Sequence, residues 1–218
     1  SNLLSQPDSS TNDGLRDLTL LAFTYDTGAR VSEVTELKFK DIRFEAPPIV
    51  KITGKGNKTR IVPLMPQTVR YLNEYVRRFG IDIAESKEHY VFTNRSGNKL
   101  SRSGIKYILD KYVAAGREDN PTIFPEKISP HTLRHTKAMH MLQAGNNIVY
   151  IRDILGHSDL DTTERYARAD TAMKREALAK AEIPMPEPQS PMPQVSPDVT
   201  RYSIEEDMAN WLKNFSQK

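Results

Sequence analysis

The stretch "SPHTLRHTKAMHMLQAGNNIVYIRDILGH", residues 129–157, predicts two short helices joined by a glycine turn. Ser129 is a favourable N-cap, Pro130 suits the first helical position, and the glycine of "QAG" ends the first helix. The second helix then covers "NNIVYIRDILG". His131 and Arg134 are three residues apart, so they share one face of the first turns, where the helix dipole favours an anion. This helical pair therefore offers a place where an anion could bind.

The segments before this pair predict helices around a small sheet. Apolar residues at helical spacing begin at Leu15 and stop at Gly28, and a short helix follows from Val31. The period then changes to two in "FKDIRF", "PIVKITG" and "TRIVPL", which predicts three strands, the last two joined by the tight turn "GKGNK". Helical spacing returns in "TVRYLNEYVRRFG" and "SGIKYILDKYVAAG", with the extended piece "YVFTNRSGNKLS" between them. We therefore expect a mainly α fold with a small antiparallel β-sheet, an α+β class.

Composition shifts divide the chain. Residues 1–13 are polar and turn-rich and predict a flexible N-terminal lead-in to a body at 14–182, which ends in the helical "SDLDTTERYARADTAMKREALAKAE". Six prolines between residues 182 and 197 predict an extended linker at 183–200. Residues 201–218 recover the spacing of an amphipathic helix, whose apolar face holds Ile204, Met208, Trp211, Leu212 and Phe215. This face should be buried, either on its own body or on a neighbouring molecule.

The composition excludes several classes of protein. The 218 residues contain no cysteine, which excludes disulfides, thiol catalysis and thiolate metal sites. No apolar run approaches the ~20 residues of a membrane helix, so we expect a cytoplasmic protein. The net charge is +3, and residues 183–218 hold three basic and five acidic residues, so the remainder carries +5. A modestly basic body fits a polyanionic partner such as nucleic acid.

Several polar residues admit both an ordinary and a functional interpretation. Arg30 follows the turn "TGA", and Glu33 comes three residues later. The two residues fit a surface ion pair, and Arg30 also fits an anion site. Lys55 and Lys58 lie at the tip of the predicted hairpin, where lysines are commonly solvated; the segment lacks the pattern of a P-loop.

Three more residues complete the set. His131 and His135 have the spacing of a zinc pair but lack the glutamate of H-E-x-x-H, so we expect no metal. His157 follows the glycine of "LGH", and Tyr166 comes nine residues later.

Taken together, these residues occur in a fixed order that resembles the catalytic domain of tyrosine recombinases, the phage or lambda integrase family. The order is an arginine after "TGA", a lysine in a strand–turn–strand unit, H-x-x-R at a helix start, "LGH", and a tyrosine nine residues later. The resemblance covers roughly residues 14–182 and is closest to integrases of mobile elements. It implies a catalytic set of Arg30, Lys55, His131, Arg134, His157 and Tyr166.

The resemblance implies a role for each residue. Tyr166 would be the nucleophile, forming a 3′-phosphotyrosyl link as a 5′-hydroxyl departs; a phenol, with a pKa near ~10, leaves more easily than an alkoxide, so the step is reversible. Arg30 and Arg134 would hold the non-bridging phosphate oxygens, and His157 would donate a further hydrogen bond. His131 would take the phenolic proton or brace the phosphate.

The remaining basic and acidic residues would support this site. Lys55 would protonate the departing oxygen, with Lys58 as the competing candidate, and Glu33 would orient a catalytic side chain. Lys58, Arg60 and Arg102 are further expected DNA contacts. No metal or nucleotide cofactor is implied, because the arginines supply the electrostatic stabilisation.

The resemblance also implies partners. Family members usually carry an N-terminal core-binding domain, so we expect this chain to be part of a longer protein. Without that domain, this chain should bind double-stranded DNA weakly. In this family a C-terminal segment docks on the neighbouring subunit, which links four protomers. The resemblance therefore implies a homo-tetramer on synapsed DNA. Integration, excision or transposition of a mobile element is the expected purpose, with a directionality factor as an accessory partner and nucleoid association on DNA. The alternatives are DNA relaxation by a type IB topoisomerase and a non-catalytic DNA-binding module.

Overall fold

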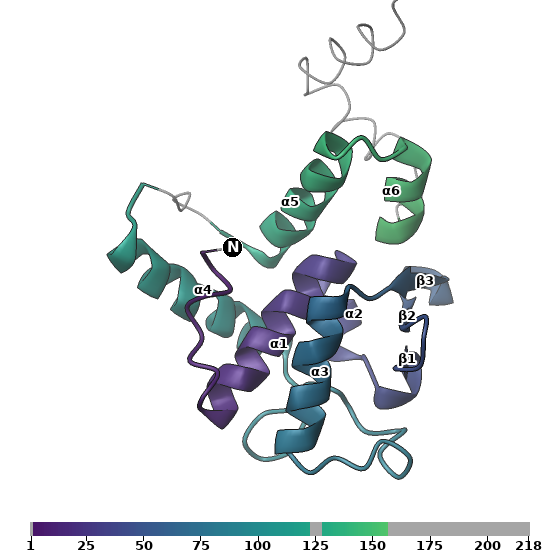
Figure 1. Cartoon of the computed structure of the whole chain (residues 1–218), viewed down its shortest axis with the longest axis vertical. Coiled ribbons are helices and arrows are strands. Elements are labelled where there is room, and N and C mark those ends of the chain that lie inside the picture. The colour runs from purple at the N-terminus through teal and green to yellow at the C-terminus, as the bar shows by residue number, and fades with distance from the viewer. Residues whose placement is uncertain (1, 123–127, 157–218) are drawn as a thin grey trace, which may run out of the picture. The chain divides into compact units, whose positions relative to one another are not determined.

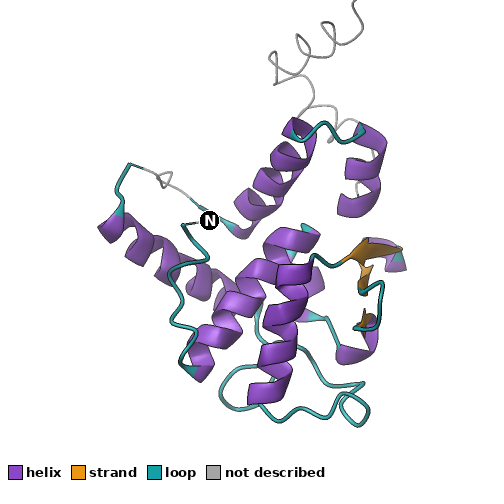
Figure 2. Ribbon diagram, viewed as in Figure 1, coloured by secondary structure: helices purple, strands orange, loops and turns teal. Residues whose placement is uncertain are grey.

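The computed structural model describes residues 2–122 and 128–156 (Figure 1). The elements in chain order are α1 (Asn12–Thr27), α2 (Val31–Thr35), the 3₁₀ turn η1 (Phe39–Asp41), β1 (Ile42–Arg43), β2 (Ile49–Thr53), the 3₁₀ turn η2 (Lys55–Asn57), β3 (Thr59–Pro63), α3 (Pro66–Arg78), α4 (Arg102–Asp119), α5 (Pro130–Gln143) and α6 (Ile148–Leu155). Figure 2 shows that helices dominate and that the strands form one small sheet. The predicted α+β class is confirmed.

Helix α1 is the central element of the described fold. The Thr11 hydroxyl caps it by accepting from the Gly14 N–H at 3.0 Å, and Gly28 ends it in the left-handed conformation at φ 58°. Most of its residues are buried around the whole circumference, as expected of a helix that packs against others on several sides. It lies beside α3 and also contacts α5 (Figure 1). Its end therefore lies close to the helical pair formed by α5 and α6.

The sheet is antiparallel in the order β1-β2-β3. Val50 pairs with Val62, and Ile52 pairs with Arg60, so these side chains share the inner face. The strand predicted in "FKDIRF" is wrong over its first half, because residues 39–41 form η1. There the Phe39 N–H donates to the His89 carbonyl at 3.1 Å, and residues 42–43 alone join the sheet. A distant loop thus supplies the partner that a longer strand would have needed.

The described part of the N-terminal segment differs from the flexible lead-in predicted for residues 1–13. Residues 2–11 form turns on the body, with Leu3 and Leu4 packed against the core and Pro7 buried. The Arg78 guanidinium donates to the Ser9 carbonyl at 2.6 Å. These residues therefore pack as turns in the structure, and their flexibility stays a prediction.

Helix α4 presents one apolar face to the core, with Ile105, Leu109 and Tyr112 buried. The Tyr112 hydroxyl donates to the buried Asp17 carboxylate at 3.0 Å and so ties α4 to α1. Within residues 2–122 and 128–156, we find no helix with the length and hydropathy needed to cross a membrane.

Helices α5 and α6 form a neighbouring pair with a small core of their own (Figure 1). This core contains Ala138, Leu142, Ile151 and Leu155. Ser129 caps α5, Asn147 caps α6 by accepting from the Val149 N–H at 2.8 Å, and Gly156 ends α6 in the left-handed conformation at φ 64°. The predicted limits of both helices are confirmed, while the following helix, the linker and the tail lie outside the described residues.

Candidate active site

Arg30 lies at the N-cap of α2, two residues after the left-handed Gly28 that ends α1. Its Nη1 donates to Glu33 Oε1 at 3.1 Å, and its Nη2 donates to the Gly156 carbonyl at 3.4 Å. Glu33 Oε2 also accepts from the backbone N–H of Arg30 at 2.8 Å. The carboxylate thus fixes both the main chain and the side chain of Arg30, while 37% of that side chain stays exposed. This geometry suits the predicted role of Glu33, which is to orient a catalytic side chain, while the role itself stays a prediction.

Arg134 projects from the second turn of α5 into the protein and is only 5% exposed. Its Nη1 donates to the Gly28 carbonyl at 2.7 Å, and its Nη2 donates to the Leu155 carbonyl at 2.6 Å. One planar guanidinium thereby joins the end of α1 to the end of α6. Hydrogen bonds from a charged donor to buried carbonyls are among the stronger kinds in proteins. Arg134 therefore holds α1 and α6 together and also belongs to the candidate site.

Arg60 is also directed inward, from the inner face of β3, with 10% of its side chain exposed. Its Nε donates to the Ile154 carbonyl at 2.8 Å, and its two Nη atoms donate to the two oxygens of Glu33 at 3.0 and 2.8 Å. Arg60 was predicted as a DNA contact; here its Nε and both Nη atoms donate to protein acceptors, and a contact with DNA stays a prediction. The sequence held a signal for this position: alternation along "TRIVPL" places Arg60 on the same face as the buried Val62.

The last turn of α6 is the point where these arginines converge. Three consecutive carbonyls, those of residues 154, 155 and 156, accept from Arg60, Arg134 and Arg30 in turn. Carbonyls at a helix C-terminus lack partners within the helix and carry partial negative charge, so guanidinium groups stabilise them. The next residue is His157, which lies with Tyr166 outside the described residues. The arrangement fixes the chain directly before the predicted histidine.

The other predicted residues lie on exposed surfaces. Lys55 and Lys58 flank the hairpin tip, where Gly56 and Asn57 adopt positive φ values of 74° and 58°. His131 is exposed in the first turn of α5, three residues before Arg134, as predicted from the helical spacing. Arg102 is exposed at the start of α4, where a DNA contact remains a prediction. In the described residues no three His, Cys, Asp or Glu side chains gather into a metal site.

Glu33 is the electrostatic partner of two of the arginines. Burial alone would raise the pKa of its carboxyl group, but hydrogen bonds from Arg60 and from the Arg30 backbone, with the charges of both guanidinium groups, outweigh this effect. The pKa of Glu33 therefore lies below its ordinary value of 4.5. Because the pKa is lower in the folded state, the ionised carboxylate contributes its full stability above its ordinary pKa, and this contribution is lost as the pH falls through the folded-state pKa.

We expect Glu33→Gln to destabilise the protein at pH 7 by about 3 kcal/mol, because breaking a buried ion pair leaves a guanidinium charge uncompensated. Urea denaturation at pH 7, 4 and 3, which extends below the ordinary pKa of the carboxyl group, measures this effect. The variant should lose less stability on acidification than the wild type does. Glu36→Gln is the matched control, since Glu36 forms a surface pair with Lys99 in which 58% of its side chain is exposed. Equal losses in the two variants would contradict the prediction.

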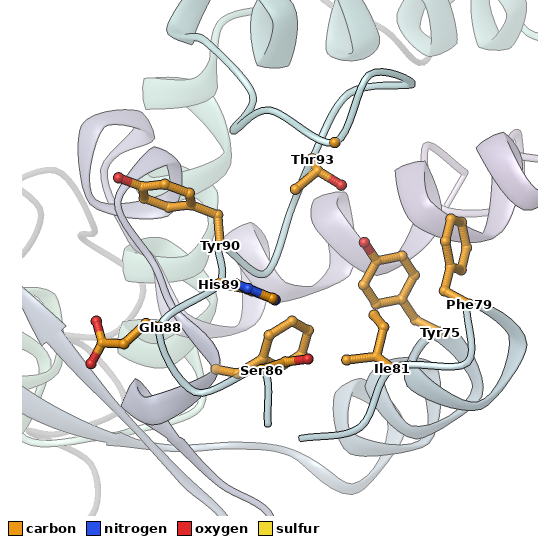
Figure 3. A pocket seen from close by; sticks show the side chains of 10 residues that line it. Tyr75, Phe79, Ile81, Ser86, Glu88, His89, Tyr90 and Thr93 are labelled. Carbon is orange, nitrogen blue, oxygen red and sulfur yellow. The ribbon is translucent and has the colours of Figure 1, made fainter. Parts of the chain in front are cut away.

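A separate hollow of about 390 Å³ lies beside the end of α3 and the loop that follows it (Figure 3). Tyr75 and Phe79 form one wall, with their ring centroids 4.6 Å apart, and Ile81, His89 and Tyr90 lie around them. None of the arginines that bind the end of α6 lines this hollow. It is therefore distinct from the candidate active site.

The chain is similar to known proteins over the whole of the described fold. The model of the phage integrase family matches residues 1–173. Tyrosine recombinase XerD of Staphylococcus epidermidis is 36% identical over 174 residues, which are 79% of this chain and 57% of XerD. The chain thus spans somewhat more than half the length of that relative.

Solved structures show the same fold. The catalytic domain of bacteriophage HP1 integrase superposes with a TM-score of 0.56 at 25% identity, over 82% of this chain and 88% of that domain. XerH recombinase, in its pre-cleavage complex with the difH substrate, superposes with a TM-score of 0.67 at 24% identity, over 84% of this chain and 52% of XerH. The resemblance derived from the ordered polar residues is confirmed. The chain belongs to the phage integrase family.

Proposed function

We propose that this chain cuts and rejoins DNA at specific sites through a 3′-phosphotyrosyl intermediate, as a site-specific tyrosine recombinase. The observation that carries the proposal is the convergence of Arg30 and Arg134 on the last turn of α6, directly before His157. Two guanidinium groups at the turn that directly precedes a histidine in the sequence suit the recognition of one phosphodiester. Family membership and the name of the XerD relative support the same activity.

The arginines would act mainly in the transition state. Attack on a phosphodiester concentrates negative charge on the two non-bridging oxygens, and guanidinium groups fixed in advance stabilise that charge. A guanidinium does not lose its proton near neutral pH, and its planar fork can bind two oxygens. Because Glu33 and Gly156 already hold Arg30, little reorganisation is needed during the reaction.

The bond changes balance without a cofactor. The Tyr166 oxygen attacks phosphorus, its proton passes to His131, and the bond to the 5′-oxygen breaks. That oxygen takes a proton from Lys55 and leaves as a hydroxyl. One phosphodiester is exchanged for another, so the reverse attack by a 5′-hydroxyl rejoins the strand.

Covalent trapping tests the proposal. The substrates are duplexes with the junction sequences of the genetic element that encodes the protein. Each carries a nick beside the scissile phosphate, so that cleavage releases a short fragment and religation is prevented. We expect a denaturant-resistant adduct whose peptide maps to Tyr166. Relaxation of a plasmid without exchange between two sites would favour a type IB topoisomerase, and binding without any adduct would favour a non-catalytic module. Either result would overturn the proposal.

The biological setting forms part of the same proposal. The substrate would be double-stranded DNA at the ends of a mobile element, which the protein integrates and excises inside the cell. Exchange between two duplexes requires four cleavages, so four copies of the chain would act together on the synapsed sites. An accessory directionality factor would bias the exchange toward one direction.

The C-terminal segment is expected to link neighbouring protomers. Its helical face with Trp211 would dock on the next subunit through the proline-rich tether at 183–200. Deleting residues 183–218 should abolish assembly on synapsed DNA while leaving single-site binding nearly intact, because the DNA-facing body is unchanged. Native gel shifts with one and with two sites measure this difference. Normal assembly and cleavage by the truncated protein would show that the segment links no subunits.

A further inference from the structure

Arg60 occupies a position that connects three separate segments of the fold. It lies on β3, binds both oxygens of Glu33 on α2, and binds the Ile154 carbonyl at the end of α6. The contacts are 2.8–3.0 Å long, and both the guanidinium and the carboxylate are nearly excluded from water. Such a planar, bidentate pair has a defined geometry, which a single lysine ammonium could not reproduce.

The contribution of this pair is better understood as geometric than as energetic. A buried ion pair contributes little net stability relative to apolar side chains of similar volume, because desolvation offsets the attraction. The neighbours of Arg60 on the inner face of the sheet, Ile52 and Val62, show that apolar packing is available there. What the ion pair adds is a fixed distance and angle between β3 and α2.

The same carboxylate also meets the other strand of the hairpin. A Cβ atom placed on Gly54, which follows β2, would lie 2.9 Å from Glu33 Oε1. That distance is too short for a carbon, so the glycine permits the hairpin base to approach the carboxylate. Glu33 therefore lies close to one end of the hairpin at Gly54 and binds the other end through Arg60, and the predicted general acid Lys55 lies between these two residues in the sequence.

We infer that Arg60 is a positioning residue that couples the placement of the Lys55 hairpin to that of Arg30 and of the turn before His157. The hairpin cannot shift without breaking the Arg60–Glu33 pair, and Glu33 cannot shift without releasing Arg30. Protonation of the leaving oxygen and binding of the phosphate are thereby set by one network. The inference rests on the proposed recombinase function and adds a residue and a linkage to it.

The test compares two leaving groups at the same scissile phosphate. A 5′-bridging sulfur leaves as a thiolate without a general acid, since a thiol has a pKa near ~8.5, whereas the natural 5′-oxygen needs a proton. The single-turnover cleavage rate on nicked substrates is measured for both, at saturating DNA. Arg60→Lys should slow cleavage of the oxygen substrate by roughly 10²-fold, because a small misplacement of a reacting group can cost that much. The sulfur substrate should recover the part of this loss that comes from the misplaced general acid, and the part that comes from Arg30 should remain.

Two further variants keep the test decisive. Gly54→Ala leaves Arg60 intact but displaces the hairpin base from Glu33, so it should give the same pattern even where Arg60→Lys folds poorly. Arg43→Lys is the matched control, since Arg43 is exposed on β1 of the same sheet and should not change either rate. Melting curves confirm that each variant is folded at the assay temperature.

The outcomes separate the inference from the proposed function. Equal losses on the oxygen and sulfur substrates, or unchanged cleavage of the oxygen substrate, would overturn the role of Arg60 in placing the hairpin. Absence of an adduct from the wild type on both substrates would instead overturn the recombinase function itself.

Discussion

Tyr166→Phe is expected to abolish the covalent protein–DNA adduct, with a loss of at least about 10³-fold, because removing the nucleophile of a covalent mechanism leaves no oxygen to attack. The substitution removes one hydroxyl and keeps the aromatic ring, so folding and duplex binding should be nearly unchanged. The measurement is adduct yield on the nicked substrate, with a parallel gel shift for binding.

A second tyrosine offers a matched control for this prediction. Tyr150 lies on α6 and is 65% exposed, so Tyr150→Phe should leave the adduct yield unchanged. An adduct that persists in Tyr166→Phe would assign the nucleophile to another residue. An adduct lost equally in both variants would indicate damage to the fold and not to the reacting group.

Arg134→Ala should affect both stability and catalysis strongly. It would leave the Gly28 and Leu155 carbonyls without their guanidinium partner inside the protein, and we expect a loss of about 3–5 kcal/mol in the free energy of unfolding. Cleavage by the folded fraction should fall by roughly 10²–10³-fold or more, by analogy with the loss of one oxyanion donor. Urea denaturation and single-turnover cleavage measure the two effects separately.

The conservative variant distinguishes charge from geometry at this position. Arg134→Lys keeps the charge, but one ammonium cannot span two carbonyls as a planar guanidinium does, so both losses should be intermediate. Arg95→Ala is the control, because 86% of the Arg95 side chain is exposed. Unchanged cleavage by folded Arg134→Ala would mean that Arg134 acts only in joining α1 to α6.

Local signals in the sequence predicted the elements that carry the site. The start of α5 followed from Ser129 and Pro130, because capping depends on residues within one turn of each other. The proximity of His131 to Arg134 on one helix likewise follows from spacing alone. The family resemblance was found from polar residues that occur in a fixed order. If these residues serve one reaction, the fold has to bring them together, and a shared fold keeps their order.

Contacts between distant segments could not be predicted in this way. The strand in "FKDIRF" was shortened because residues of the 87–90 loop bind the backbone of η1, and no local pattern describes that loop as a partner. The acceptors that bind Arg30, Arg60 and Arg134 at the end of α6 are backbone carbonyls, which every residue possesses. A sequence does not mark which of its carbonyls a distant arginine will reach.

The crowding of guanidinium groups at the end of α6 has a thermodynamic consequence. Three positive side chains meet there, while Glu33 and about half a unit of negative charge from the helix terminus offset part of them. Like charges held together this way repel, and a phosphodiester entering the cluster relieves that repulsion. Under the proposed function, duplex DNA would therefore stabilise the native state as well as serve as the substrate: at a concentration one hundred times its Kd, linkage alone would add about 2.7 kcal/mol to the stability of the fold.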